Sequence, residues 1–229
     1  MNLEVLFTQR ILIIPVLLFS IVIHEYAHAY AAYRAGDMTA ASQGRLTLNP
    51  LSHIDPIGTV ILPLFLYLRG GFIIGWAKPV PVNPLRFRSS EWDIFVSLAG
   101  PGSNFAMVAI SAILLKLAVV TRLVDSEVLI RFLVTGFIAK PEPLGFVLLF
   151  FIMINILLGI FNLIPIPPLD GSRVVYRLLA SGRSPLAEPY AALEPYGFFI
   201  LILILISPLW NLFGYVIDGA SVFVLRLVF

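Results

Sequence analysis

Long apolar runs separated by short polar segments make up most of the chain. A helix needs about 20 apolar residues to cross the hydrocarbon core of a bilayer. Three runs reach this length, at about residues 11–34, 94–120 and 144–163. Two more apolar runs, 196–206 and 209–229, are separated at Ser207-Pro208 and predict either one long kinked span or two. The pattern predicts an all-α polytopic membrane protein with about four to six transmembrane helices.

The apolar segment at 57–68 is too short for an ordinary span and is interrupted by Pro63. Gly70-Gly71 follows it, and short segments broken in this way are typical of re-entrant loops. The next segment, 79–84, alternates proline with valine or asparagine, and proline is tolerated only at the edge of a sheet. We therefore expect a re-entrant loop or a short β-hairpin, near the active site, between the first two long spans.

Composition supports a membrane protein with one domain. The 229 residues are 59% hydrophobic and 12% charged, whereas soluble domains have about 45–50% apolar and 25% charged residues. Residues 121–143, which carry mixed charges, and residues 181–189 are expected to form loops. The short loops predict a single integral-membrane domain over residues 1–229, with hydrophobic helices at 190–229. The net charge of +2 gives no reason to expect nucleic-acid binding, and the absence of cysteine excludes thiolate ligands and disulfides.

Polar residues interrupt the first apolar run at His24-Glu25-Tyr26-Ala27-His28. Ionisable residues at membrane depth are costly and indicate a functional site. Histidines at positions i and i+4 of a helix share one face, so both imidazoles can bind one zinc ion. Glu25 would then lie beside the metal as a general base that takes a proton from the attacking water. The run predicts a metalloprotease-type motif inside a transmembrane helix.

A catalytic zinc site usually has three protein ligands, so a third histidine or carboxylate is needed. His53 is a candidate by residue type, and Asp170 is a candidate because it ends a proline-interrupted segment after a long apolar span. The residues alone leave both possibilities open. Asn104 is a further polar residue at membrane depth, where an interhelical hydrogen bond is more expected than a direct catalytic role.

Three motifs together give a specific resemblance. They are His24-Glu25-x-x-His28, Ala99-Gly-Pro-Gly-Ser-Asn104 and Asn162-x-x-Pro165-x-x-x-Leu169-Asp170-Gly171. In combination they resemble the site-2 protease family of intramembrane zinc metalloproteases. The segment Gly75-Trp-Ala-Lys-Pro-Val-Pro-Val-Asn-Pro84 is similar to that of the small bacterial and archaeal members, which consist of little more than the membrane core. The resemblance covers about residues 11–180, which it implies to be the catalytic core, and the C-terminal region carries no motif of this kind.

The resemblance implies a role for each matching residue. One Zn²⁺ per chain would be bound by His24, His28 and Asp170, with Glu25 as the general base. Asn162 would orient the substrate or stabilise the oxyanion, and Pro165 and Pro167 would take part in substrate handling. His53 and Asn104 remain candidates for substrate binding or for supporting the ligands. The partners would be the lipid bilayer and a membrane-protein substrate whose transmembrane segment is locally unwound.

Topology places this site near one membrane face. The end of the first span and Asp170 can share a face only if residues 57–76 enter the membrane and return. More lysines and arginines flank that face than the other, so it is predicted to be cytoplasmic in a bacterial or archaeal cell membrane. A metal-ion or proton transporter could use the same buried His, Glu and Asp residues. The single motif, without an inverted second copy, favours the protease.

Overall fold

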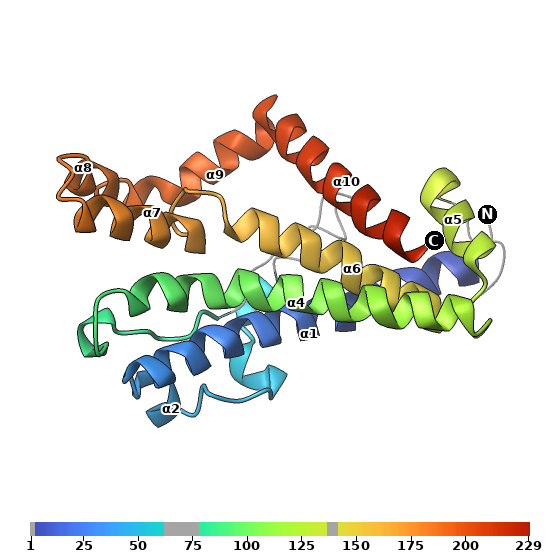
Figure 1. The fold of residues 1–229 in the computed structure, drawn as a ribbon, viewed down its shortest axis with the longest axis horizontal. Coiled ribbons are helices and arrows are strands. Elements are labelled where there is room, and N and C mark those ends of the chain that lie inside the picture. Colours follow the sequence, from blue (N-terminus) through green and yellow to red (C-terminus); the bar gives the residue numbers. More distant parts are fainter. Residues whose placement is uncertain (1–2, 62–77, 137–141) are drawn as a thin grey trace. The chain divides into compact units, whose positions relative to one another are not determined.

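A computed structural model describes residues 3–61, 78–136 and 142–229. The described residues form helices and irregular segments, without a strand, which confirms the all-α prediction. The α-helices are α1 (Leu3–Ala35), α2 (Thr39–Ser42), α4 (Trp92–Val120), α5 (Ser126–Thr135), α6 (Pro143–Asn162), α7 (Asp170–Ser181), α8 (Ala187–Ala191), α9 (Gly197–Ile206) and α10 (Leu209–Val228) (Figure 1). Shorter helical turns are η1 (Pro50–His53), η2 (Pro56–Ile61), η3 (Pro84–Arg86) and η4 (Glu194–Tyr196).

Five segments of the described chain are helical, long and apolar enough to cross a membrane. They are Leu12–Ala35, Trp92–Val120, Pro143–Asn162, Ala187–Ile206 and Leu209–Val228. The first three confirm the predicted long spans. At the C-terminus the chain forms two segments, because α9 ends at Ile206 and α10 begins at Leu209, after Pro208. The question that the sequence left open is therefore answered in favour of two helices.

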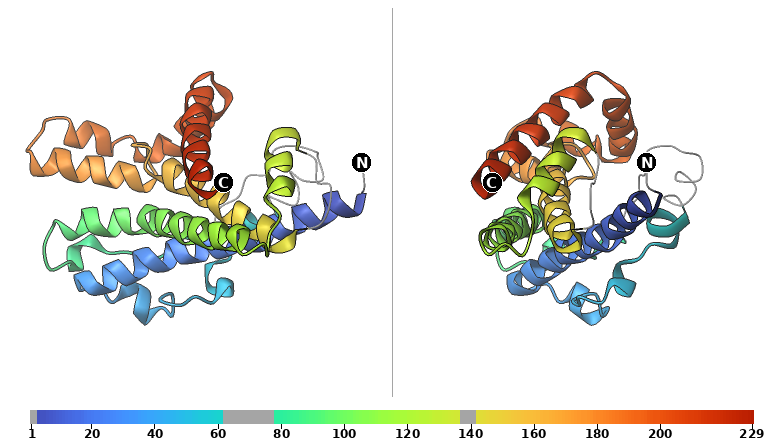
Figure 2. Two further views of the ribbon diagram at one scale, coloured as in Figure 1. Left: turned by 45° about the vertical axis from the view of Figure 1, so that its right-hand side comes forward. Right: turned by 90° about the vertical axis from the view of Figure 1, so that its right-hand side faces the viewer.

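The chain divides into two compact units, Met1–Ser20 with Pro101–Phe229 and Ile21–Gly100. In the first unit, α6 and the second half of α4 run side by side, and α10 packs against α6 and α9 (Figures 1 and 2). Side chains from α4, α5, α6 and α10 and from the start of α1 form its apolar core, centred on Leu115, Leu129, Leu149 and Ile152. This core holds α6, the helix that precedes the Asp170 segment.

A buried polar network joins three helices of the first unit. Asn104 of α4 donates to Asn155 Oδ1 of α6 at 2.7 Å, and Asn155 Nδ2 donates to Ser20 Oγ of α1 at 2.9 Å. All three residues are fully buried. A buried amide without a partner is costly, so these bonds favour one register between the helices. Asn104 thus has the interhelical role that its position in the sequence predicted.

The second unit packs the C-terminal half of α1 against irregular chain. Ala29, Ala32 and Ala35 are fully buried, and their small side chains allow close approach of the chain around Val80 and Val96. The predicted hairpin lies partly in residues 62–77, outside the described residues, as does most of the predicted re-entrant segment 57–76. Within the described part, residues 78–83 have no regular secondary structure, so the hairpin remains a prediction.

Two surface segments differ from the sequence-based interpretation. The region between the second and third spans was expected to be a mixed-charge loop, but it contains α5. Asp125 caps its N-terminus by accepting from Glu127 N, and Gly136 ends it with a left-handed conformation at φ 67°. The region after α7 was also expected to be a loop and contains the short helix α8.

Asp37 connects the end of α1 to the irregular chain. It is fully buried, and its carboxylate accepts from Thr39 N at 3.0 Å and from Asn83 N at 2.7 Å. Burial raises the pKa of Asp37, but the hydrogen bonds from Asn83 and Thr39 and the charge of Arg86 outweigh this and lower the pKa overall. The ionised carboxylate therefore stabilises this corner of the second unit.

We predict that Asp37→Asn lowers the free energy of unfolding by about 1–3 kcal/mol at pH 7, because an amide cannot accept all three hydrogen bonds, from Thr39 N, Thr39 Oγ1 and Asn83 N. The folded pKa lies below the unfolded one, so the stabilisation is present at neutral pH and is lost as pH falls through the folded value. Thermal unfolding in detergent should show a difference between the variants that shrinks at acid pH. Asp125→Asn is the control, since asparagine is an equally good N-cap. A difference independent of pH would contradict the role of the charge.

Candidate metal centre

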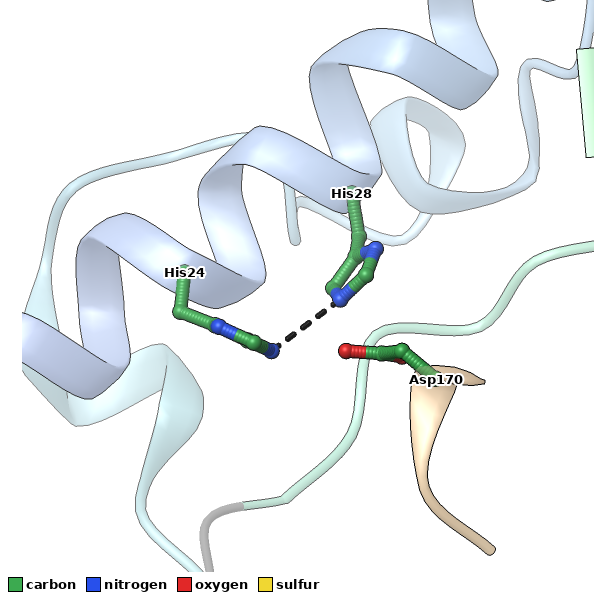
Figure 3. A group of neighbouring side chains, drawn as sticks. All are labelled: His24, His28 and Asp170. Atoms are coloured by element: carbon green, nitrogen blue, oxygen red, sulfur yellow. Dashed lines mark hydrogen bonds between the residues drawn. The ribbon is translucent and has the colours of Figure 1, made fainter. Parts of the chain in front are cut away.

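The two motif histidines face each other on one side of α1. Their Nε2 atoms lie 3.1 Å apart, and the imidazole centroids are 4.7 Å apart at an interplanar angle of 77°. Figure 3 shows both rings extending from the helix toward the same point, with the dashed line joining them. Both side chains are buried, at 7% and 9% exposure. The i, i+4 spacing therefore brings two nitrogen donors together in an environment shielded from water, as predicted from the sequence.

The tautomer of His28 suits metal binding. Its Nδ1 lies 2.7 Å from the carbonyl oxygen of Val96, in the second turn of α4. A carbonyl can only accept, so Nδ1 carries the proton and Nε2 presents its lone pair to His24. Metal-binding histidines commonly donate their second ring nitrogen to a carbonyl in this way, which fixes the ring orientation. The Val96 carbonyl had no signal in the sequence motif.

The distance between the histidines fits a zinc ion. Two nitrogens bound to one tetrahedral zinc at about 2.0–2.1 Å lie about 3.3 Å from each other, close to the observed 3.1 Å. Gly100 of α4 packs against the same pair, and a Cβ atom there would come within 2.6 Å of His24 Nε2 and closer still to His28 Nε2. The glycine keeps this space open, so the residues present are compatible with a metal site.

Glu25 lies between the histidines in the sequence and contacts the irregular segment 78–83. Its Oε2 accepts a hydrogen bond from Val80 N at 2.8 Å. Val80 is itself buried against Ala29 and Ala40. A backbone donor therefore holds one oxygen of the carboxylate that the motif predicts to be the general base.

His53 has a different environment from the motif histidines. It is 1% exposed, and its Nε2 lies 2.9 Å from the carbonyl oxygen of Thr47, to which it must donate. Its own carbonyl accepts from Lys78 N. Among the described residues of the unit Ile21–Gly100, no third histidine or carboxylate joins His24 and His28 as a possible metal ligand. His53 therefore supports the loop structure of this unit.

Asp170 belongs to the other unit, where it is the first residue of α7; Figure 3 labels it with the two histidines. The chain between α6 and α7 folds back on the start of α7. A Cβ atom at Gly171 would meet the carbonyl oxygens of Leu163 and Ile164, so glycine is required for this close approach. The conformation of the segment that ends at Asp170 thus depends on backbone contacts.

The C-terminal elements hold the same segment. Tyr190 of α8 donates its hydroxyl to the carbonyl of Pro165 at 2.9 Å. Gly197, the first residue of α9, packs against the backbone of Pro167, where a Cβ atom would clash with the carbonyl. Pro165 is exposed and Pro167 is buried. These two contacts give the region without a recognisable motif a role in placing the residues before Asp170.

Asn162 is the last residue of α6 and is partly buried. Its Nδ2 donates to Leu158 O, one turn back in the same helix, at 3.0 Å. The structure thus describes the histidine pair and Glu25 in one unit, and Asn104, Asn162, Pro165, Pro167 and Asp170 in the other. Sequence reasoning singled out these side chains and the motif that contains Gly100, but not the contact of Gly100 with the histidines. It missed Val96, Tyr190 and Gly197, because the first acts through its carbonyl and the other two through contacts with chain that is distant in the sequence.

Comparison with known proteins agrees with these features. The model of Peptidase family M50 matches residues 12–205. The Bacillus subtilis (strain 168) protein named "Putative zinc metalloprotease YwhC" is 39% identical over 84% of this chain and 79% of its own length. The Mycolicibacterium smegmatis protein named "Putative zinc metalloprotease Rip2" is 32% identical over 88% of this chain and 69% of its own length. No solved structure matches the chain.

We predict that Gly100→Ala strongly weakens zinc binding, because the added methyl group would overlap both imidazoles. Displacing groups that orient metal ligands costs about 10–100-fold in affinity or activity. Competition with a chromophoric chelator would measure the loss. Gly102→Ala is the matched control on the same helix, since a Cβ atom there has open space among the described residues. Equal zinc affinity in the two variants would contradict the packing role of Gly100.

Proposed function

We propose that this chain is a zinc-dependent intramembrane endopeptidase, because it belongs to peptidase family M50, the site-2 protease family. The observation that carries the proposal is the pair of converging Nε2 atoms on a helix apolar enough to span a membrane, with Glu25 between the two histidines. The names of the similar proteins from Bacillus subtilis and Mycolicibacterium smegmatis support a zinc metalloprotease. Family membership favours a peptidase over the transporter that the sequence left as an alternative.

The zinc ligands in this proposal are His24, His28 and Asp170. Each offers one donor atom, an imidazole nitrogen from each histidine and an oxygen from the aspartate. Three protein ligands with one open position are typical of catalytic zinc. When bound, zinc acts as a Lewis acid that polarises the substrate carbonyl and lowers the pKa of water. His28 is already held in the required tautomer by the Val96 carbonyl.

The other residues of the site position groups and move a proton. Glu25 takes a proton from the attacking water and returns it to the leaving amine as the peptide bond breaks. Val80 N holds one oxygen of this carboxylate. Asn162 supplies a neutral amide at the end of α6, a type of donor that stabilises a developing oxyanion in a site shielded from water.

The substrate class follows from the location of the site. A membrane-embedded protease meets transmembrane segments, whose backbone carbonyls are engaged in helical hydrogen bonds. Cleavage therefore requires local unwinding of the substrate, and we assign Pro165, Pro167 and the segment near Val80 to substrate handling. The excess of lysine and arginine on one side of the predicted topology supports a site near the cytoplasmic face of the cell membrane.

We predict that Glu25→Gln retains zinc but loses proteolysis, since an amide cannot accept the proton from water. General-base catalysis contributes about 10²–10⁴-fold, so the rate should fall by that factor. The assay uses a reporter with one transmembrane segment, containing a Gly-Pro pair, reconstituted with the protease in liposomes. Full activity of Glu25→Gln would remove Glu25 from the mechanism, and no cleavage by the wild type would contradict the proposed function.

Asp170 as third ligand gives a separate prediction. Asp170→Asn should lose both zinc and proteolysis, whereas His53→Ala should keep close to one zinc per folded chain, because His53 Nε2 is engaged with Thr47. Metal analysis of the purified variants measures both. Asp218→Asn is the control, a carboxylate of α10 to which the proposal gives no role. Zinc loss in His53→Ala with zinc retention in Asp170→Asn would reverse the assignment.

A further inference from the structure

Residues 78–83 have no regular secondary structure, yet backbone groups along the segment are held by other parts of the second unit. Lys78 N donates to His53 O at 2.9 Å. Val80 N donates to Glu25 Oε2 at 2.8 Å, and Asn83 N donates to Asp37 Oδ2 at 2.7 Å. These bonds fix the segment at its start, middle and end. Its position beside the proposed general base therefore does not depend on a sheet.

Arg45 holds the same segment from the side of the carbonyl groups. Its Nη2 donates to the carbonyl of Lys78 at 2.6 Å and to that of Pro79 at 3.3 Å. The side chain is only 7% exposed. Burying a guanidinium is costly unless it is hydrogen-bonded, and here two carbonyls of the irregular segment accept from Nη2, whereas Nε is buried without a hydrogen-bond partner among the described residues.

The hydrogen bond that Arg45 donates and the one that Glu25 accepts involve the same peptide group. The carbonyl of Pro79 and the N–H of Val80 belong to the same planar unit, with the oxygen and the hydrogen on opposite sides. Arg45 fixes the oxygen, and the N–H then points at the Glu25 carboxylate. A cation at the carbonyl also polarises the peptide, which strengthens the N–H as a donor. The direction of one hydrogen bond to Glu25 is thus set by a side chain 20 residues away in the sequence.

We propose that Arg45 is a positioning residue for Glu25, acting through the Pro79–Val80 peptide. This inference rests on the proposed function, in which Glu25 is the general base. By holding Oε2, the peptide fixes the rotation of the carboxylate about its terminal bond. Arg45 touches neither histidine in any described contact, so its loss should slow the proton transfer and leave metal binding intact.

The test compares Arg45→Gln with Arg45→Lys in the liposome reporter assay. Arg45→Gln should lower kcat by about 10–100-fold, the usual cost of removing a group that orients the reacting residues, with little change in KM. Arg45→Lys should recover part of the loss, since an ammonium can still donate to a carbonyl. Both variants should bind one zinc per chain and keep the melting temperature of the wild type within a few degrees.

Arg86→Gln is the matched control. Arg86 is exposed, lies just after the same segment and donates to Thr39 Oγ1 at 3.4 Å. It should keep wild-type kcat and KM. A second variant tests the peptide itself: Val80→Pro removes the N–H that donates to Glu25. Val80→Pro should reproduce the kcat loss of Arg45→Gln.

Each outcome decides the inference. A kcat loss in Arg45→Gln and Val80→Pro that is smaller in Arg45→Lys and absent in Arg86→Gln, with zinc retained, supports it. Unchanged kcat in Arg45→Gln, a loss that appears only in KM, or loss of zinc together with activity overturns it and leaves Arg45 with a structural or substrate-binding role. Glu25→Gln in the same assay distinguishes failure of the proposed function from failure of the positioning role. If Glu25→Gln is as active as the wild type, the proposed function fails. If Glu25→Gln is inactive but Arg45→Gln is fully active, only the positioning role of Arg45 is wrong.

Discussion

The close approach of the His24 and His28 imidazoles on one face of the apolar helix α1 is the constraint on which the other features of the second unit depend. Their Nε2 atoms lie 3.1 Å apart and are shielded from water, so the orientation of each ring must be fixed by protein contacts. The Val96 carbonyl fixes the proton on His28, and Gly100 leaves room for both rings. Both residues lie at the start of α4, so the packing of α4 on α1 in this unit is also the means by which the pair is oriented.

Small residues make that packing possible. Ala29, Ala32 and Ala35 line α1 beyond the histidines, and each is fully buried. In a membrane protein, close approach of backbones replaces much of the hydrophobic driving force that water supplies to soluble proteins. The same close approach brings the 78–83 segment within hydrogen-bonding distance of Glu25. The alanines and Gly100 thus allow the close backbone packing that holds the histidines and Glu25 in place.

The sequence predicted the long helices and the convergence of the two motif histidines. The three long spans follow from apolar length, and the histidine pair follows from helical periodicity, since both depend on local rules. Asp170 could be ranked above His53 only through the family resemblance, because its place depends on chain far away in the sequence. The helix α5 was missed although Asp125 and Gly136 mark its ends, because its mixed charge suggested a loop.

The contacts that could not be predicted all involve backbone groups, which no side-chain motif records. These groups are the Val96 carbonyl, the Val80 N–H, and the carbonyls of Pro165 and Pro167. Their partners lie at distant positions: His28 and Glu25 on α1, Tyr190 of α8, and Gly197 of α9, which packs against Pro167. The carbonyl of Pro79 likewise accepts from Arg45, after α2. Each proline lacks an N–H group, so a proline-rich segment has fewer donors than carbonyls and takes some donors from elsewhere. Segments 79–81 and 165–168 therefore accept hydrogen bonds from Arg45 and Tyr190, and through Tyr190 a region without a motif helps to hold the residues that precede Asp170.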